Sequence, residues 1–267
     1  MKNTRFRKAE GNQKHAPVNS ANHPKSDEAQ QRSDPMDPII FTSRLKLTLV
    51  TKAERGSPEL EWFHELHSNE KATWWSIYGQ AKSIEDTEKV MKGYLPTNEG
   101  EENMYRVAYA VHKILESMNG SVEGEPQPAE QEKKSTKFVG LVTLKSLDAG
   151  SLALPEDLTI PIAATTTTLT VELAYLFLPI GWGKGYATES VEAVFESCKR
   201  TRSFWTPFSK LYIRAVVNES NPASLRVIDK TGMTKSGVYD WTGKAIFLAG
   251  EWRERDSLHI FGMHLLE

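Results

Sequence analysis

Three glycines at alternate positions, Gly181, Gly183 and Gly185, stand between a hydrophobic stretch and an amphipathic one. Glycine has no side chain, so a ligand can approach the backbone N–H groups of such a turn closely. The following segment has helical periodicity, and a helix N-terminus carries unpaired N–H groups and about +0.5 of an elementary charge. This combination favours binding of a diphosphate or a similar anion. The alternative is a tight strand-to-helix turn that binds no ligand.

The glycine turn matches neither of the two common nucleotide-binding motifs. A P-loop requires Gly-Lys followed by Ser or Thr, whereas Lys184 is followed by Gly185. A dinucleotide-binding fingerprint that starts at Gly181 would need a third glycine where Tyr186 stands. A nucleotide-binding α/β protein whose turn binds another phosphate is therefore kept only as an alternative.

The turn resembles the pyrophosphate loop of the GNAT superfamily of acyl-CoA N-acyltransferases, which reads Gln/Arg-x-x-Gly-x-Gly/Ala. Trp182 takes the place of the usual Gln or Arg, and the run from Gly183 to Glu189 looks most like the branch that acetylates ribosomal-protein N-termini. The loop of that family works through backbone N–H groups, so the Trp is a mild departure. The resemblance implies that the pyrophosphate of acetyl-CoA is bound by Trp182, Gly183, Lys184, Gly185, Tyr186, Ala187 and Thr188.

A second motif lies downstream, where Asn221 and Ser224 are followed by Lys-Thr-Gly-Met ending at Met233. It resembles the Asn-x-x-Ser helix of the same family, which ends in Lys-x-Gly-Phe. There the pantetheine arm lies between two diverging strands, whose unpaired backbone groups it satisfies. Asn221 is also the expected cap of a helix, and one residue can fill both roles. The resemblance implies that the arm is bound by Leu176, Phe177, Leu178, Asn221 and Ser224.

The implied reaction is direct attack of a primary amine on the acetyl-CoA thioester within a ternary complex. Glu172, a carboxylate in an otherwise apolar strand, is the candidate base, because a charge there is costly without a role or a partner. The alternatives are a structural hydrogen bond of Glu172 and a water chain as the proton route. A backbone N–H at Phe177 or Leu178 is expected to stabilise the oxyanion. Ile228 stands where the family usually has a tyrosine acid, and Ser224 is the implied substitute.

Aromatic residues that follow the first predicted helix are candidates for the acceptor site. The resemblance places Trp74, Trp75 and Tyr78 at the acceptor pocket together with Glu172, whereas core packing is the alternative. Trp241 and Trp252 are expected to wall the same pocket. The pair His64 and His67 lacks an acidic third ligand at helical spacing, so no metal is expected.

The elements that position these residues follow from hydrophobic periodicity and capping residues. Ser57, Ser83 and Asn221 are predicted to begin three helices, and a fourth follows the glycine turn. Their order with the strands predicts an α+β fold. The resemblance makes this a single mixed, strongly twisted and splayed sheet of about six to seven strands flanked by about four helices. Strands are predicted over 45–49, 105–111, 138–144, 169–178, 211–217, 245–248 and 258–263.

Composition divides the chain into a tail and one domain. Residues 1–37 are polar and predict a disordered tail, residues 38–267 a GNAT-like acetyltransferase domain, and residues 119–137 a flexible hairpin insertion. The lone Cys198 excludes an internal disulfide and is expected to be buried and inert. The sequence has no apolar run of about 18 residues and no apolar segment after its first basic residues, so neither a membrane span nor a secretory signal is expected.

The leading hypothesis is an N-acetyltransferase that uses acetyl-CoA and needs no metal. Its acceptor is the primary amine of a small molecule, a peptide or a protein. The net charge of −2 requires neither a nucleic-acid nor a membrane partner. A monomer or homodimer in the cytoplasm, or in the nucleus, is expected. The alternative is a non-catalytic acyl-CoA-binding sensor or interaction module on the same fold, because Ile228 stands in the acid position.

Overall fold

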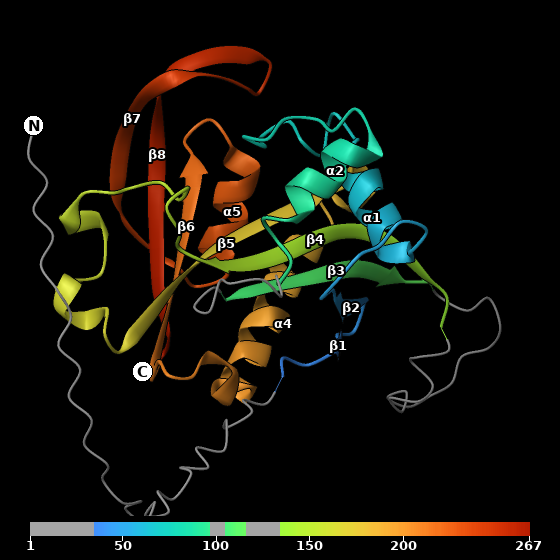
Figure 1. The fold of residues 1–267 in the computed structure, drawn as a ribbon, viewed down its shortest axis with the longest axis horizontal. Helices are drawn as coiled ribbons and strands as arrows, with labels where there is room; N and C mark the ends of the chain where they lie inside the picture. The colour runs from blue at the N-terminus through green and yellow to red at the C-terminus, as the bar shows by residue number, and fades with distance from the viewer. Residues whose placement is uncertain (1–34, 97–104, 116–133) are drawn as a thin grey trace, which may run out of the picture. The chain divides into compact units, whose positions relative to one another are not determined.

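The computed structural model describes residues 35–96, 105–115 and 134–267, and these residues form one mixed sheet with helices on both faces. The strands are β1 (Ile39–Phe41), β2 (Leu45–Leu49), β3 (Arg106–Ile114), β4 (Thr136–Ser146), β5 (Thr168–Phe177), β6 (Lys210–Asn218), β7 (Thr234–Leu248) and β8 (Glu251–Leu266). Within the described ranges they form an eight-stranded sheet in the order β1-β2-β3-β4-β5-β6-β8-β7 (Figure 1). The predicted α+β class is therefore confirmed, with more strands than expected.

Two hydrophobic clusters cover opposite faces of this sheet. Successive strand residues point to opposite faces, so Val107 and Tyr109 belong to one cluster while Ala108 and Ala110 belong to the other. The first cluster contains residues of α4 (Tyr186–Arg200) and α5 (Pro222–Lys230), and the second those of α1 (Pro58–His67) and α2 (Ile84–Met91). Cys198 is fully buried in the first cluster, as predicted.

The predicted capping residues begin three of the α-helices. Ser57 Oγ accepts a hydrogen bond from the Leu60 N–H at 3.3 Å and begins α1. Ser83 does the same for α2, where the Asp86 N–H donates at 3.1 Å. The N–H groups of a first helical turn have no intrahelical acceptor, so these side chains stabilise each start.

The central strands β5 and β6 separate part of the way along the sheet. Their parallel pairing runs from Thr168 opposite Lys210 to Glu172 opposite Arg214 and then stops. Beyond this point β6 stays paired with β8, and β5 stays paired with β4. We call this opening between β5 and β6 the fork. It confirms the predicted splaying of the sheet.

The β7–β8 hairpin is much longer than the sequence pattern predicts. Strands were expected over 245–248 and 258–263, whereas β7 and β8 contain 15 and 16 residues. Most of β7 is exposed, so its side chains need not alternate between apolar and polar. Ala249 and Gly250 connect the strands with φ angles of 52° and 83°, the conformation of a type I′ turn.

The boundary of the predicted tail lies slightly too late in the sequence. Met36 is 2% exposed, and Asp37 accepts hydrogen bonds from Ser197 and Arg200 of α4, so both residues belong to the packed domain. The tail up to residue 34 and residues 119–133 of the insertion lie outside the described residues. Thr136 and Lys137, predicted as its last residues, belong to β4. No helix in the described part of the chain is long and apolar enough to span a membrane.

Candidate active site

A cleft of about 1240 Å³ has both sides of the fork in its walls. It is also lined by the glycine turn, the start of α5, the segment after α1 and the β7–β8 hairpin. Of the predicted residues, Leu178 and Lys184 do not line it, and neither does Trp252, which is 72% exposed. Most of the predicted residues do line it: Trp74, Trp75, Tyr78, Glu172, Leu176, Phe177, Trp182, Gly183, Gly185, Tyr186, Ala187, Thr188, Asn221, Ser224 and Trp241.

The glycine turn presents the N-terminus of α4 to the cleft. Gly183 and Gly185 have φ angles of 69° and 78°, a left-handed conformation that strains other residues. Gly185 is the N-cap of α4 and supplies no side-chain hydrogen bond, so the first N–H groups of this 15-residue helix have no side-chain cap. The backbone of the turn therefore meets the requirements for an anion site.

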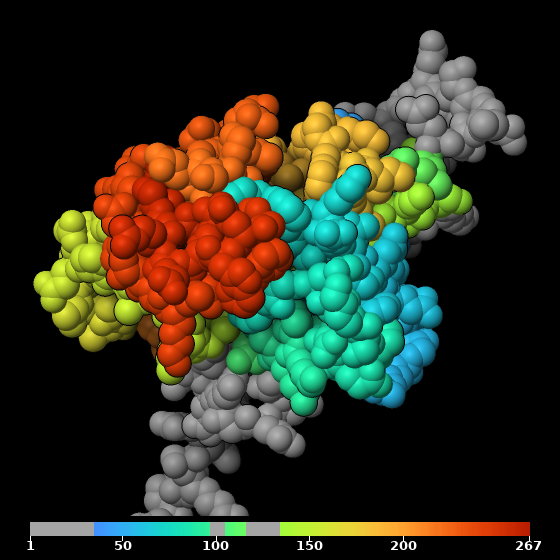
Figure 2. All heavy atoms as spheres, turned by 90° about the horizontal axis from the view of Figure 1, so that it is seen from above, coloured from blue at the N-terminus to red at the C-terminus, as the bar shows by residue number. Residues whose placement is uncertain are grey.

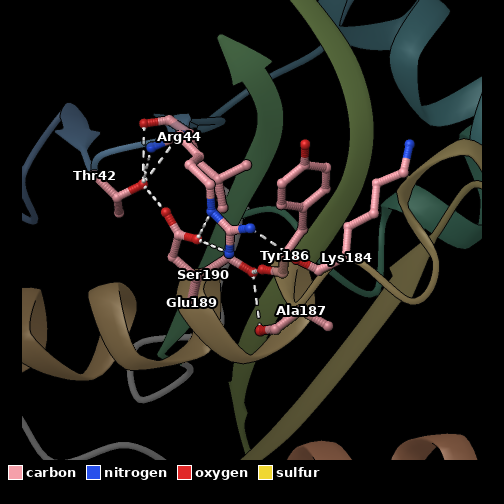
Figure 3. Close-up of polar contacts among 8 residues, drawn as sticks. Thr42, Arg44, Lys184, Tyr186, Ala187, Glu189 and Ser190 are labelled. Carbon is pink, nitrogen blue, oxygen red and sulfur yellow. Dashed lines mark hydrogen bonds and ion pairs between the residues drawn. The ribbon is translucent and has the colours of Figure 1, made fainter.

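Arg44, from the turn between β1 and β2, fixes the glycine turn from outside the cleft (Figure 3). Its Nη1 donates to the Lys184 carbonyl at 2.9 Å, and its Nε donates to Glu189 Oε2 at 2.7 Å. The guanidinium also lies 5.1 Å from the centre of the Tyr186 ring. Sequence reasoning missed Arg44, because about 140 residues separate it from these partners.

The backbone of β5 decides which amides face the fork. The Leu178 N–H donates to the Val139 carbonyl at 2.9 Å, on the β4 side. The backbone N–H and C=O groups of successive strand residues point alternately to the two neighbouring strands. Those of Tyr175 and Phe177 therefore face the fork. The Leu178 N–H, one of the two expected oxyanion donors, is thus already bonded to Val139. The Phe177 N–H is the remaining candidate. The Phe177 carbonyl accepts a hydrogen bond from the Trp182 indole at 2.7 Å.

Glu172 and Arg214 form an ion pair at the point where the fork opens. Arg214 donates to Glu172 Oε2 at 2.9 Å from Nε and at 2.7 Å from Nη2. The Arg214 side chain is 5% exposed and also donates to the Leu152 carbonyl, whereas the Glu172 side chain is 36% exposed and lines the cleft. Glu172 Oε1 makes no hydrogen bond with a described residue. Oε2 of Glu172 therefore makes a structural ion pair, whereas Oε1 has no hydrogen-bond partner in the described part of the chain.

Ser224 is paired with a hydroxyl that the sequence did not single out. The Tyr175 hydroxyl lies 2.7 Å from Ser224 Oγ and donates to the Ser224 carbonyl at 3.1 Å. Burial raises the pKa of Tyr175 to about 12, so this phenol stays protonated at neutral pH. Ile228 is fully buried and has no proton to donate. Alternation of strand residues predicts Tyr175 in β5 but not its partner on α5.

The end of the β7–β8 hairpin lies against the segment that follows α1. In Figure 2 the red end of the hairpin contacts the cyan residues of this segment. The Ala249 N–H donates to the Trp74 carbonyl at 2.9 Å, and the Trp74 ring lies over Gly250. The Arg253 guanidinium lies 5.7 Å from the centre of the Trp75 ring. The aromatic wall of the cleft is therefore built from two segments that are distant in sequence.

The two histidines of α1 do not form a metal site with their neighbours. His64 Nδ1 bonds to Thr87 Oγ1 at 2.9 Å, while His67 is fully buried between the rings of Phe63 and Tyr94. Among residues 35–96, 105–115 and 134–267, no group of three or more His, Cys, Asp or Glu side chains is placed to hold a metal ion.

A comparison with curated protein sequences found no match. A GNAT-family acetyltransferase structure from Bacillus anthracis is 17% identical, covers 85% of this chain and 98% of its own, and has a TM-score of 0.49. A spermidine N-acetyltransferase structure from Vibrio cholerae, solved with CoA and spermine, is 17% identical and has a TM-score of 0.47. The match covers 82% of this chain and 95% of the spermidine N-acetyltransferase.

The match that decides the family is the one to a family model. The model described as an acetyltransferase (GNAT) domain matches residues 44–234. This range begins at Arg44, contains the glycine turn and the fork, and extends to the first residue of β7. The chain belongs to the GNAT family of acetyltransferases.

Proposed function

We propose that this protein is an N-acetyltransferase that transfers an acetyl group from acetyl-CoA to a primary amine in a ternary complex. The observation that carries the proposal is the fork between β5 and β6, with the uncapped N-terminus of α4 beside it in the same cleft. A long thioester carrier with a diphosphate at one end matches both features. Family membership supports the acetyltransferase chemistry.

The donor is proposed to lie along β5. Backbone N–H groups of the glycine turn, from Gly183 to Thr188, bind the diphosphate. The Trp182 indole N–H already donates a hydrogen bond to the Phe177 carbonyl. The indole therefore flanks the diphosphate site and makes no hydrogen bond to acetyl-CoA. The amides of pantetheine then pair with the backbone groups of Tyr175 that β6 leaves free. Asn221 and Ser224 close the opposite side of the arm.

The chemistry needs a base, an oxyanion donor and a donor to the leaving sulfur. The amine nitrogen forms the C–N bond and loses a proton to Glu172 Oε1, directly or through water. The Phe177 N–H stabilises the tetrahedral oxyanion. The C–S bond then breaks, and the sulfur accepts a hydrogen bond or proton from Ser224 Oγ–H. As Ser224 gives up its proton, the Tyr175 O–H turns from the Ser224 carbonyl to Ser224 Oγ, 2.7 Å away, and this pair takes the place of the usual acid at Ile228.

The acceptor is proposed to enter on the side of the sheet that carries α1. Glu172 and Leu176 alternate with Tyr175, so they face the other side of β5 from the Tyr175 hydroxyl. Trp74, Trp75 and Tyr78 are all in the cleft wall and are more than core residues, because Trp74 and Tyr78 are 45% and 58% exposed. The acceptor is a primary amine that contacts these rings.

The experiment combines binding with turnover. Acetyl-CoA should raise the thermal midpoint of the full chain by mass action, whereas ATP and NAD at equal concentrations should not. Addition of an amine panel should then release free CoA thiol. Stabilisation without release of thiol from any amine would instead favour the non-catalytic sensor. A shift with ATP or NAD but none with acetyl-CoA would favour the nucleotide-binding alternative.

A further inference from the structure

Two buried polar side chains in the wall of the cleft each have one atom without a hydrogen-bond partner among the described residues. Asp256 Oδ2 and Asn218 Nδ2 are both shielded from solvent and make no hydrogen bond with any described residue. The Asp256 side chain is 9% exposed, Asn218 is 8% exposed, and both line the cleft. Buried polar groups are almost always hydrogen-bonded, because an unmet bond is costly. The pair therefore points to a ligand.

The orientations of the two groups are fixed by their other atoms. Asn218 Oδ1 accepts the Ser220 N–H at 2.8 Å, which places the amide nitrogen as the free atom. Asp256 Oδ1 accepts from Arg253 Nη1 at 2.8 Å, which leaves Oδ2 free. Arg253 is itself held by Glu251 and by the Leu248 carbonyl, to which its Nε donates at 3.2 Å. This pair of side chains thus presents one free donor, Asn218 Nδ2, and one free acceptor, Asp256 Oδ2, to the cleft.

The two groups are close enough to bind one small group together. Asn218 is opposite Leu258 in the β6–β8 ladder, and the Glu219 N–H donates to the Ser257 carbonyl in the next step. Asn218 and Asp256 are therefore diagonal neighbours, with Cα atoms about 7–8 Å apart. Trp241 lies opposite Asp256 on β7 and also lines the cleft. This distance fits a planar group that has both a donor and an acceptor.

We propose that Asn218 and Asp256 recognise a carboxamide or peptide unit of the acceptor, next to the amine that is acetylated. The N–H of this unit donates to Asp256 Oδ2, and its carbonyl accepts from Asn218 Nδ2. A second ammonium group fits less well, because a cation cannot accept a hydrogen bond from Asn218 Nδ2. The inference rests on the proposed function and names the class of acceptor for that site.

The test compares three acceptors that share a CH3–CH(NH2)– unit: alaninamide, its apolar isostere 3-methylbutan-2-amine, and 1,2-diaminopropane. Asp256→Asn keeps the size of the side chain and should lower kcat/KM for alaninamide by about 10- to 100-fold, since a hydrogen bond to a charged group is lost. The loss for 3-methylbutan-2-amine should be no more than about threefold. Each variant is compared with the wild type for the same acceptor, so differences in amine pKa cancel.

Two further variants separate recognition from support of the hairpin. Asn218→Asp keeps the acceptor for Ser220 but removes the free donor, so activity should fall for alaninamide and rise for 1,2-diaminopropane. Arg253→Gln removes the cation that pairs with Asp256 Oδ1, so it should favour 1,2-diaminopropane over the other two acceptors. The exposed Asp240→Asn on β7 is the matched surface control. Equal losses for all acceptors in Asp256→Asn, or a larger loss for the diamine, would overturn the proposal.

A binding measurement keeps the test independent of turnover. Alaninamide should raise the thermal midpoint of the CoA-bound wild-type protein more than 3-methylbutan-2-amine does, and this difference should vanish in Asp256→Asn. If no amine releases CoA thiol but this difference is found, the proposed function fails while the inference about recognition stands. If amines are acetylated and the two compounds bind equally, the inference fails and the function stands.

Discussion

The hydroxyl of Tyr175 lies 2.7 Å from Oγ of Ser224 and so links β5 to the first turn of α5 inside the cleft. This pair places two hydroxyl groups in series on the side of the sheet that carries α4 and α5. We therefore expect the two residues to act on the leaving sulfur as one unit. Removal of either hydroxyl should cost nearly as much as removal of both.

Tyr175→Phe should lower kcat by about tenfold or more, with a smaller change in KM for acetyl-CoA. The raised pKa of about 12 keeps the Tyr175 hydroxyl protonated, so its loss of a proton should not reduce activity between pH 7 and 10. Steady-state kinetics over that pH range measure both effects. Tyr105→Phe, which removes a hydroxyl bonded to the Thr206 carbonyl, is the control. Wild-type kcat in Tyr175→Phe would rule out the paired role.

Arg44→Gln should raise KM for acetyl-CoA by about tenfold and change kcat little, because a charged hydrogen bond to the glycine turn is lost. Glu189→Gln should act in the same direction, since it weakens the hold on Arg44. Arg55→Gln is a matched control, because Arg55 is an exposed arginine that pairs with Glu85 and Glu88. An unchanged KM in Arg44→Gln would mean that the turn keeps its shape without this contact.

Acid should destabilise the fold through His67. Burial lowers the pKa of His67 to about 4, below its value of 6.5 in the unfolded chain. The stability that this group contributes is thus complete above pH 6.5 and is lost as pH falls towards 4, by on the order of 3 kcal/mol at pH 4. Denaturant unfolding should show that the free energy of unfolding falls less between pH 6.5 and pH 4 in His67→Leu than in the wild type. The control His264→Leu, at an exposed position, should lose as much free energy of unfolding as the wild type.

Ala249→Asn should stabilise the protein by about 0.5–1 kcal/mol, because Asn tolerates the positive φ of a type I′ turn better than Ala does. The turn already has Gly at its second central position, Gly250. The backbone N–H that bonds to Trp74 is retained. Thermal unfolding would show a raised midpoint, and a lowered one would mean that the Asn side chain clashes with the segment after α1.

The sequence predicted those parts of the site in which neighbouring residues determine the structure. The glycine turn and its helix are contiguous, and the caps Ser57, Ser83 and Asn221 act within three residues of themselves. Local chemistry therefore sufficed to predict these elements. The strand that carries Glu172 was predicted on the same grounds, from a nearly continuous apolar run.

The missed parts depend on contacts between distant residues. Arg44 looked like an ordinary polar residue before a strand, since nothing near it in sequence indicates Glu189. Asp256 lay in a stretch with no apolar alternation, because β7 and β8 are largely exposed there. Its position in the cleft depends on the ladder that pairs β8 with β6. Such pairings across the sheet cannot be derived from one sequence.

The fork has a consequence for the dynamics of the empty protein. Because the β5–β6 ladder stops at Glu172 and Arg214, the amides of Tyr175 and Phe177 lack a strand partner on that side. Their hydrogens should exchange with deuterated solvent faster than those of Leu176, which faces β4. Acetyl-CoA would complete the ladder as a substitute strand, so binding should slow exchange at these two positions selectively. The ligand would then act as a missing piece of secondary structure.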